Sequence, residues 1–285
     1  MSEPEHAFKT STEFQEVYDL ADPSAYFQAL APLNYRMPQV TCDVLRHLAP
    51  TLRDAFGAER LQVLDFGCGF GVNGALLTHR VSLEEIYAHF AQETSNLARD
   101  QAFFQPRRQA DPGFEVGGLD IAEQALAYGR ALGFLGTVFS DDATDGPIVP
   151  PLADYLAGTH VIIETGAVFE ALMPAVDNLL GACDPARRPW VLASPRPDVD
   201  SRLLLQVFQR HGYTFQTCNR RPISYRKMLG ATEREDAIRI IEARGDDSAA
   251  LLKDGWFHVD LVLARPADTR APSLDDLLAQ LDEEL

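Results

Sequence analysis

Apolar residues follow two alternating patterns along this chain. Uninterrupted apolar runs predict buried β-strands, which we place at residues 61–65, 114–119, 136–139, 160–163, 190–193, 215–218 and 257–264. Between these runs, apolar residues recur every three or four positions and predict helices at residues 39–56, 72–77, 81–104, 122–132, 169–180, 201–211 and 237–243. The alternation of strands with helices indicates an α/β fold built on a doubly wound sheet.

The same patterns suggest how the chain is divided. Residues 1–58 are predicted to form an N-terminal helical segment or cap, and residues 59–266 the main domain. Residues 80–113 form a helical insertion between the first helix and the second strand of that domain. Residues 267–285 are a polar tail with a leucine stripe, which favours a packed or frayed helix over a partner-binding motif.

A glycine-rich turn follows the first predicted strand, in the run Val-Leu-Asp-Phe-Gly-Cys-Gly-Phe-Gly at residues 63–71. Glycine lets a backbone bend sharply and approach a ligand closely. Asp65, at the strand end, can receive the ammonium group of an amino-acid ligand. Gly69, Gly71 and Gly74 also match the dinucleotide fingerprint G-x-G-x-x-G. In that motif an acidic residue follows after roughly 20 residues, whereas here the best strand-end carboxylate, Asp120, comes much later.

The run resembles motif I of the class I, Rossmann-like S-adenosylmethionine (SAM)-dependent methyltransferases, and with the insertion the chain resembles an uncharacterised branch of them. The resemblance implies a seven-stranded, mostly parallel sheet with an antiparallel last strand. It also implies SAM as cofactor and S-adenosylhomocysteine as product. The cofactor residues that it implies in this turn are Asp65, Gly67, Cys68, Gly69 and Gly71. A nicotinamide-dependent oxidoreductase and a non-catalytic SAM-binding protein stay open as alternatives.

Two further segments resemble cofactor-binding motifs of the same family. The run at residues 117–126 matches its second-strand motif, so that Asp120 would bind the ribose hydroxyls and Ile121 would line the adenine. The other interpretation is that Asp120 only caps the following helix. Asp142 and Ala143 follow the third predicted strand, where the family often contacts the adenine amino group; a solvated loop charge is the alternative for Asp142.

Glu164 and Thr165 follow the fourth predicted strand, which takes the place of motif IV. Sheets of this type bind ligands at the carboxyl ends of their strands, so both residues are candidates to face the cofactor or the methyl acceptor. An ordinary strand-to-helix turn is the alternative. The acidic residue that usually precedes this strand is replaced by Thr159 and His160, which is a departure from the family pattern.

A general base is needed only if the attacking atom must lose a proton. The candidates for a catalytic base or orienting group are His89, Glu164, Tyr225 and His258, and those for binding the substrate are Tyr35, Arg36 and Tyr87. Arg36 is included because a guanidinium binds carboxylates in a bidentate manner. A structural role is the alternative for each histidine. Arg220, Arg221 and the segment 225–227 form a basic island, which would either attract an anionic acceptor or balance nearby acids.

The insertion at residues 80–113 is predicted to be a lid on the substrate side. Methyl transfer benefits from the exclusion of water, and mobile segments often provide it in enzymes. Tyr87 lies in this insertion. A helical hairpin that only packs against the core is the alternative.

The composition limits the kinds of partner and the cellular compartment that we expect. The chain has 25 basic and 42 acidic residues and a formal net charge of −17, which disfavours nucleic acid and anionic membranes as partners. Its four cysteines form no C-x-x-C pair, so neither disulfides nor a metal site are expected. No apolar run reaches the roughly 18 residues of a membrane span, and no signal peptide is recognisable. We expect a cytoplasmic protein, either a monomer or a homodimer.

The sequence also narrows the class of acceptor. No Asn-Pro-Pro-Tyr or Asp-Pro-Pro-Tyr run follows the fourth predicted strand, and no Pro-Cys pair occurs, which disfavours methylation of adenine, glutamine or cytosine. An oxygen, nitrogen or sulfur atom of a small molecule or of a protein side chain remains. A small molecule is favoured because enzymes of large substrates usually carry a recognition domain or a basic face. The prediction is therefore a SAM-dependent methyltransferase with a small-molecule acceptor.

Overall fold

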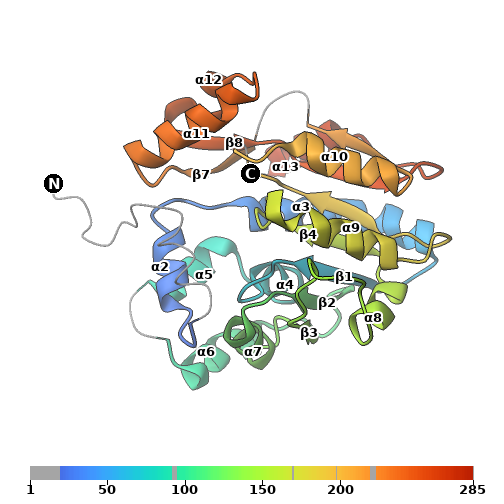
Figure 1. The fold of residues 1–285 in the computed structure, drawn as a ribbon. Helices are drawn as coiled ribbons and strands as arrows, with labels where there is room; N and C mark the ends of the chain where they lie inside the picture. The colour runs from blue at the N-terminus through green and yellow to red at the C-terminus, as the bar shows by residue number, and fades with distance from the viewer. Residues whose placement is uncertain (1–19, 92–94, 169, 197, 219–222, 285) are drawn as a thin grey trace.

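The computed structural model describes residues 20–91, 95–168, 170–196, 198–218 and 223–284. Residues 1–19 of the predicted N-terminal segment, and Arg220 and Arg221 of the basic island, lie outside these ranges. The chain begins with helices α2 (Ser24–Leu30) and α3 (Met37–Phe56). It then alternates strands and helices in one layered domain (Figure 1).

Seven strands form one sheet in the order β3-β2-β1-β4-β5-β9-β6. Their bounds are β1 Leu61–Phe66, β2 Phe114–Leu119, β3 Thr137–Phe139, β4 Val161–Glu164, β5 Trp190–Ala193, β6 Tyr213–Thr217 and β9 Val262–Pro266. Strands β1 to β5 are parallel, and β9 runs antiparallel to both of its neighbours, β5 and β6. The strand order reverses between β1 and β4, which is the position where doubly wound sheets bind ligands. The predicted fold class is confirmed, including the antiparallel last strand.

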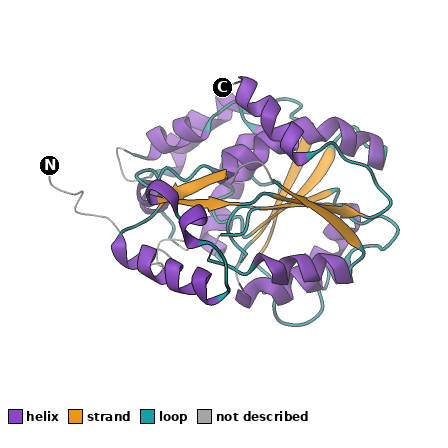
Figure 2. Cartoon of the chain, turned by 90° about the horizontal axis from the view of Figure 1, so that it is seen from above, coloured by secondary structure: helices purple, strands orange, loops and turns teal. Residues whose placement is uncertain are grey.

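Helices cover both faces of this sheet (Figure 2). The helices between the strands are α4 (Val72–Thr78), α5 (Leu83–Phe90), α6 (Leu97–Phe104), α7 (Glu123–Ala131), α8 (Leu152–Gly158), α9 (Met173–Ala182), α10 (Ser201–Arg210) and, after β9, α13 (Leu274–Glu284). Short 3-10 turns occur at Gln105–Arg107, Glu170–Leu172 and Lys253–Gly255.

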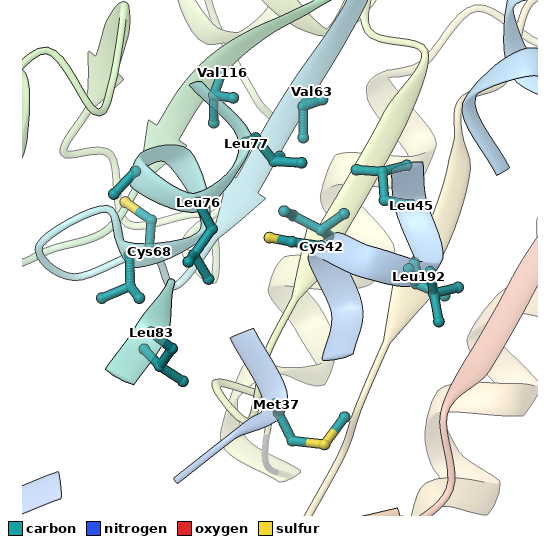
Figure 3. Packing of buried hydrophobic residues seen from close by; sticks show 14 of the residues in the cluster. Met37, Cys42, Leu45, Val63, Cys68, Leu76, Leu77, Leu83, Val116 and Leu192 are labelled. Atoms are coloured by element: carbon teal, nitrogen blue, oxygen red, sulfur yellow. The ribbon is translucent and has the colours of Figure 1, made fainter. Parts of the chain in front are cut away.

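Successive strand residues contribute to two different hydrophobic cores. Val63 of β1 belongs to the core formed with α3, α4 and α13, whereas Leu64 belongs to the core formed with α8, α9 and α10. This follows from the strand geometry, because neighbouring side chains point to opposite faces. Figure 3 shows the first core, where Leu77 of α4 lies near Val63 of β1, and Leu45 of α3 lies near Leu192 of β5. The leucine stripe of the tail packs here too, through Leu274 and Leu277 of α13.

A second, two-stranded sheet was not predicted. It pairs β7 (Ile223–Lys227) with β8 (Trp256–Val259) and lies beside α11 (Ala231–Ala243) and α12 (Ser248–Leu251) (Figure 1). The sequence predicted one strand over residues 257–264, and this prediction was wrong because the segment divides between the two sheets. Apolarity is the same in both halves, so the pattern alone does not reveal the break.

The insertion also differs from its prediction as one helical stretch. It contains two short helices: α5, which starts with a capping box at Ser82 and Glu85, and α6, which is capped by Asn96. Ala91 is the C-cap of α5, and residues 92–94 lie outside the described ranges. Helix α8, which lies between the predicted third and fourth strands, was not predicted. Within the described ranges, no helix combines the length and apolarity of a membrane span.

Candidate active site at the carboxyl edge of the sheet

The glycine turn after β1 has a conformation that other residues rarely adopt. Gly67, Gly69 and Gly71 have φ angles of 67°, 49° and 78°. The Gly67 amide donates a hydrogen bond of 2.8 Å to the Leu119 carbonyl at the end of β2. A Cβ atom on Gly67 would lie 2.2 Å from the Cβ of Ala167, in the loop after β4. The turn therefore joins the carboxyl ends of β1, β2 and β4 at close quarters.

Asp65 is buried beside this turn with one oxygen unpaired. Its side-chain Oδ1 accepts a hydrogen bond of 2.8 Å from the Asn73 amide, which also lies 3.2 Å from the Thr165 hydroxyl. Its Oδ2 is buried and has no hydrogen-bond partner among the described residues. Burial raises the pKa of Asp65 to about 8, although the hydrogen bond from Asn73 opposes this shift. A buried, unpaired carboxylate oxygen is unfavourable unless a donor or cation supplies the missing contact.

Asn73 was not among the predicted site residues. It is 3% exposed, lies in the first turn of α4 and links β1 to the loop after β4. A polar residue among the apolar positions of that helix is the signal that would have found it.

The predicted ribose carboxylate, Asp120, lies directly against the glycine turn. Its Oδ2 accepts a hydrogen bond of 2.8 Å from the Gly69 amide, and its Oδ1 one of 2.9 Å from the Ala122 amide. Next to it, Ile121 is an exposed apolar side chain, 71% accessible to solvent. Asp120 therefore links the glycine turn to the residue before α7, and α7 has no side-chain cap at its N-cap residue Ala122.

The other predicted cofactor residues lie at the same edge. Asp142, in the loop after β3, is exposed and accepts hydrogen bonds from the hydroxyl and the amide of Thr144, which lower its pKa. Ala143 is buried, and its carbonyl accepts a hydrogen bond from Asn178. Cys68 is buried in the glycine turn, where burial holds the pKa of its thiol well above the usual range.

Glu164 is buried at the end of β4 and is fully engaged within the protein. Its Oε2 accepts hydrogen bonds from the backbone amides of the next loop, at Gly166, Ala167 and Val168, and its Oε1 accepts one of 2.6 Å from Ser194. Burial raises its pKa to about 7 despite these bonds. Glu164 fixes the loop after β4 against the loop after β5, and the predicted catalytic contact would require some of these bonds to break.

Three predicted tyrosines meet over the loop after β4. The Tyr35 hydroxyl donates a hydrogen bond to the Thr165 carbonyl, and its ring lies 5.0 Å from that of Tyr225. The Tyr87 hydroxyl donates one of 2.8 Å to the Tyr35 carbonyl. Burial raises the pKa of Tyr225, which keeps its hydroxyl protonated at neutral pH. The structure therefore brings residues from the N-terminal segment, the insertion and β7 to one place.

The two predicted histidines lie elsewhere. His89 is bonded to the buried carboxylate of Asp100 at 2.7 Å and stacks on Phe103 at 4.1 Å. His258, on β8, faces Ser224 at 3.4 Å. Among the described residues, neither histidine has a hydrogen bond or ring contact with Asp65 or the tyrosines. Within the described ranges, no group of three or more His, Cys, Asp or Glu side chains could hold a metal ion, and this includes the surroundings of both histidines.

Helix α2 and the insertion together cover the glycine turn. Phe27 of α2 stacks on Phe90 of α5 with ring centroids 4.3 Å apart, and Gln28 donates a hydrogen bond to the Phe90 carbonyl. Tyr26 contacts Phe70, whose side chain is 1% exposed in the middle of the turn. Figure 1 shows α2 and α5 side by side next to α4.

Comparison with protein-family models and with curated protein sequences finds no match. Similar solved structures include a functionally unknown protein from Deinococcus radiodurans R1, with 14% identity, 90% of this chain and 99% of that chain covered, and a TM-score of 0.45. Another is the O-methyltransferase of a trans-AT PKS multienzyme from Brevibacillus brevis, crystallised with S-adenosyl-L-homocysteine (13% identity, 85% and 82% covered, TM-score 0.41). A third is magnesium protoporphyrin IX methyltransferase from Synechocystis PCC 6803 with bound SAM. Its sequence identity is 13%, 80% of this chain and 79% of that chain are covered, and the TM-score is 0.37.

These TM-scores lie below 0.5, so the fold is assigned from the strand order itself. Five parallel strands reverse order between β1 and β4, and the last strand is inserted antiparallel between β5 and β6. With this sheet and the glycine turn after β1, the chain has a Rossmann-like, doubly wound fold.

Proposed function

We propose that this protein is a SAM-dependent methyltransferase that acts on an oxygen, nitrogen or sulfur atom of a small molecule. The observation that carries the proposal is the unpaired Oδ2 of Asp65, buried beside the positive-φ glycine turn at the point where the strand order reverses. The ammonium group of an amino-acid ligand would supply the contact that this oxygen lacks. SAM and S-adenosylhomocysteine both carry such a group.

The residues at the carboxyl edge fit the rest of that cofactor. The glycine turn allows a ligand to approach the backbone closely, and the Asp120 carboxylate is in place to exchange its Gly69 contact for the ribose hydroxyls. The exposed side chain of Ile121 offers an apolar surface for the adenine. Asp142 and Thr165 complete the proposed set from the neighbouring loops.

The remaining residues would align the acceptor. SAM supplies a methyl group that is already strongly electrophilic, so the main task of the chain is orientation, which can lower a barrier by roughly 7–11 kcal/mol. The hydroxyls of Tyr35 and Tyr225, over the loop after β4, would bind and orient the acceptor. Burial raises the pKa of Tyr225, so its hydroxyl would act as a neutral group. The cover formed by α2 and the insertion would exclude water, which is the proposed role of the predicted lid.

The first test is calorimetric titration of the purified protein with S-adenosylhomocysteine, with NADH and NADPH alongside. S-adenosylhomocysteine is expected to bind saturably, and NADH and NADPH are expected not to bind. Binding of a nicotinamide cofactor instead would reject the proposal in favour of an oxidoreductase. Binding without turnover of any acceptor in a broad screen would favour a non-catalytic SAM-binding protein.

A substitution at Asp120 tests the proposed ribose contact. Asp120→Ala is expected to weaken S-adenosylhomocysteine binding by roughly 1–3 kcal/mol, because charged hydrogen bonds to the ligand are lost. The substitution also removes the bonds to Gly69 and Ala122, so a control must lose a similar hydrogen bond from a backbone amide two residues later. Asp184→Ala removes a 2.9 Å hydrogen bond from the Ala186 amide, in the loop before β5, and should leave the affinity unchanged. Equal calorimetric affinities of the two variants would place the ribose elsewhere.

A further inference from the structure

Two exposed cations converge on one indole ring at the outer side of the tyrosines. The guanidinium carbon of Arg36 lies 5.9 Å from the ring centroid of Trp256, and the Lys227 ammonium lies 5.8 Å from it. Lys227 and Trp256 are directly opposite each other in the β7–β8 pair. We call Arg36, Lys227 and Trp256 the cationic patch.

In the part of the chain that the structure describes, the two cations of this patch have no acidic partners, unlike other cations of the chain. Two other cations have acidic partners: Arg226, in β7, pairs with Glu233 at 2.6 Å, and Arg196, in the loop after β5, pairs with Asp198. Arg36 and Lys227, in contrast, have no ion pair among the described residues, although the chain carries 17 more acidic than basic side chains. Both cations lie at one indole ring, and an anion bound there would be attracted by both charges.

Backbone hydrogen bonds connect the patch to the proposed acceptor side of the site. The Arg36 amide donates to the Tyr225 carbonyl at 3.1 Å, and the Lys227 amide donates to the Leu33 carbonyl at 2.6 Å. The segment before α3 therefore runs along β7, with Arg36 bonded to Tyr225 and Leu33 bonded to Lys227. Tyr35, the neighbour of Arg36, reaches Thr165 in the loop after β4.

We propose that the methyl acceptor carries an oxyanion, a carboxylate or a phosphate, that binds to Arg36 and Lys227. This inference rests on the proposed function and specifies its substrate class. Trp256 is a positioning residue, because the Arg36 and Lys227 charges lie 5.9 Å and 5.8 Å from its indole centroid. A guanidinium and an ammonium together suit an oxyanion, since each donates several charge-assisted hydrogen bonds.

Binding of small oxyanions tests the patch directly. The probes are benzoate, phenyl phosphate and the neutral benzamide, titrated with and without saturating S-adenosylhomocysteine. Trp256 reports binding by fluorescence, because Trp190, the other tryptophan, is fully buried in the sheet. Benzoate or phenyl phosphate is expected to bind at least about 10-fold more tightly than benzamide. The tighter of the two identifies the group as a carboxylate or a phosphate.

Matched variants separate the patch from general electrostatics. Arg36→Gln/Lys227→Gln should weaken oxyanion binding by about 10-fold or more, whereas Arg80→Gln/Arg130→Gln, with the same change of charge at exposed positions before α5 and in α7, should not. The inference is overturned if benzamide binds as well as benzoate, if the first variant binds like the wild type, or if no saturable change occurs up to about 10 mM. Loss of S-adenosylhomocysteine binding would instead count against the proposed function, since the oxyanion titration is also made without it.

Discussion

Replacing Asp65 with asparagine is expected to lower the affinity for S-adenosylhomocysteine by about 100-fold while making the free protein more stable. The affinity falls because the amide cannot pair its charge with an ammonium group. The stability rises because the carboxylate is fully buried and its Oδ2 has no partner among the described residues. An asparagine keeps the shape of the side chain and can still accept the hydrogen bond from Asn73.

The pH dependence gives this prediction a definite sign. The pKa of Asp65 rises from 3.8 to about 8 on folding, so the folded state favours the protonated form. Its contribution to stability is fully present below pH 3.8 and is lost as the pH rises to about 8, at roughly 1.4 kcal/mol per pH unit. The pKa of Glu164 rises from 4.5 to about 7, so this residue also makes the protein less stable as the pH rises. The effect of Glu164 is the same in the wild type and in Asp65→Asn.

Urea unfolding of the free proteins at several pH values would measure these effects, with calorimetry for the ligand. The stability advantage of Asp65→Asn should be largest near pH 8 and vanish toward pH 4. Asp65 must lose its proton to pair with an ammonium group, so wild-type affinity should rise between about pH 6 and pH 8. A variant that binds S-adenosylhomocysteine normally would remove Asp65 from the proposed site, and a destabilised one would mean that its Oδ2 has a partner in the folded protein.

The second large effect is expected at Gly166, in the loop after β4. Gly166 has a φ of 80°, and a Cβ atom there would lie 1.9 Å from the Tyr225 hydroxyl oxygen. Gly166→Ala must therefore displace Tyr225, and with it the ring of Tyr35 that packs on it. We expect the free energy of unfolding to fall by about 3 kcal/mol, and methyl transfer to an accepted substrate to fall with it.

Gly146→Ala is the matched control, because Gly146 has a φ of 85° and nothing lies within 4 Å of its Cβ position. It isolates the cost of the backbone conformation, which should be about 1 kcal/mol. Adding Tyr225→Phe to Gly166→Ala removes the oxygen at 1.9 Å and should recover part of the lost stability in urea unfolding. Similar losses for the two alanine variants, with no recovery, would show that the loop adapts without moving the tyrosines.

The sequence was informative wherever a local signal is sufficient. Strand β2 has the same bounds as its predicted run, and the glycine turn lies directly after β1 as expected. Apolar runs and glycine turns are local properties, and they determine the strand, its turn and the burial of Asp65 at the strand end. The order of these elements along the chain was also sufficient to predict the doubly wound sheet.

The tertiary structure decided which of the candidate residues meet. Tyr35, Tyr87 and Tyr225 come from three distant segments, and only the packing of the segment before α3, the insertion and β7 brings them together beside Thr165. Nothing in the local pattern separates these tyrosines from His89, which the same packing buries against Asp100 instead. The lack of a partner for the Asp65 Oδ2 among the described residues and the convergence of Arg36 and Lys227 on Trp256 likewise depend on how distant segments pack together. Sequence periodicity reports which face of an element is buried, whereas a site depends on contacts between elements, which are set only when the whole core packs.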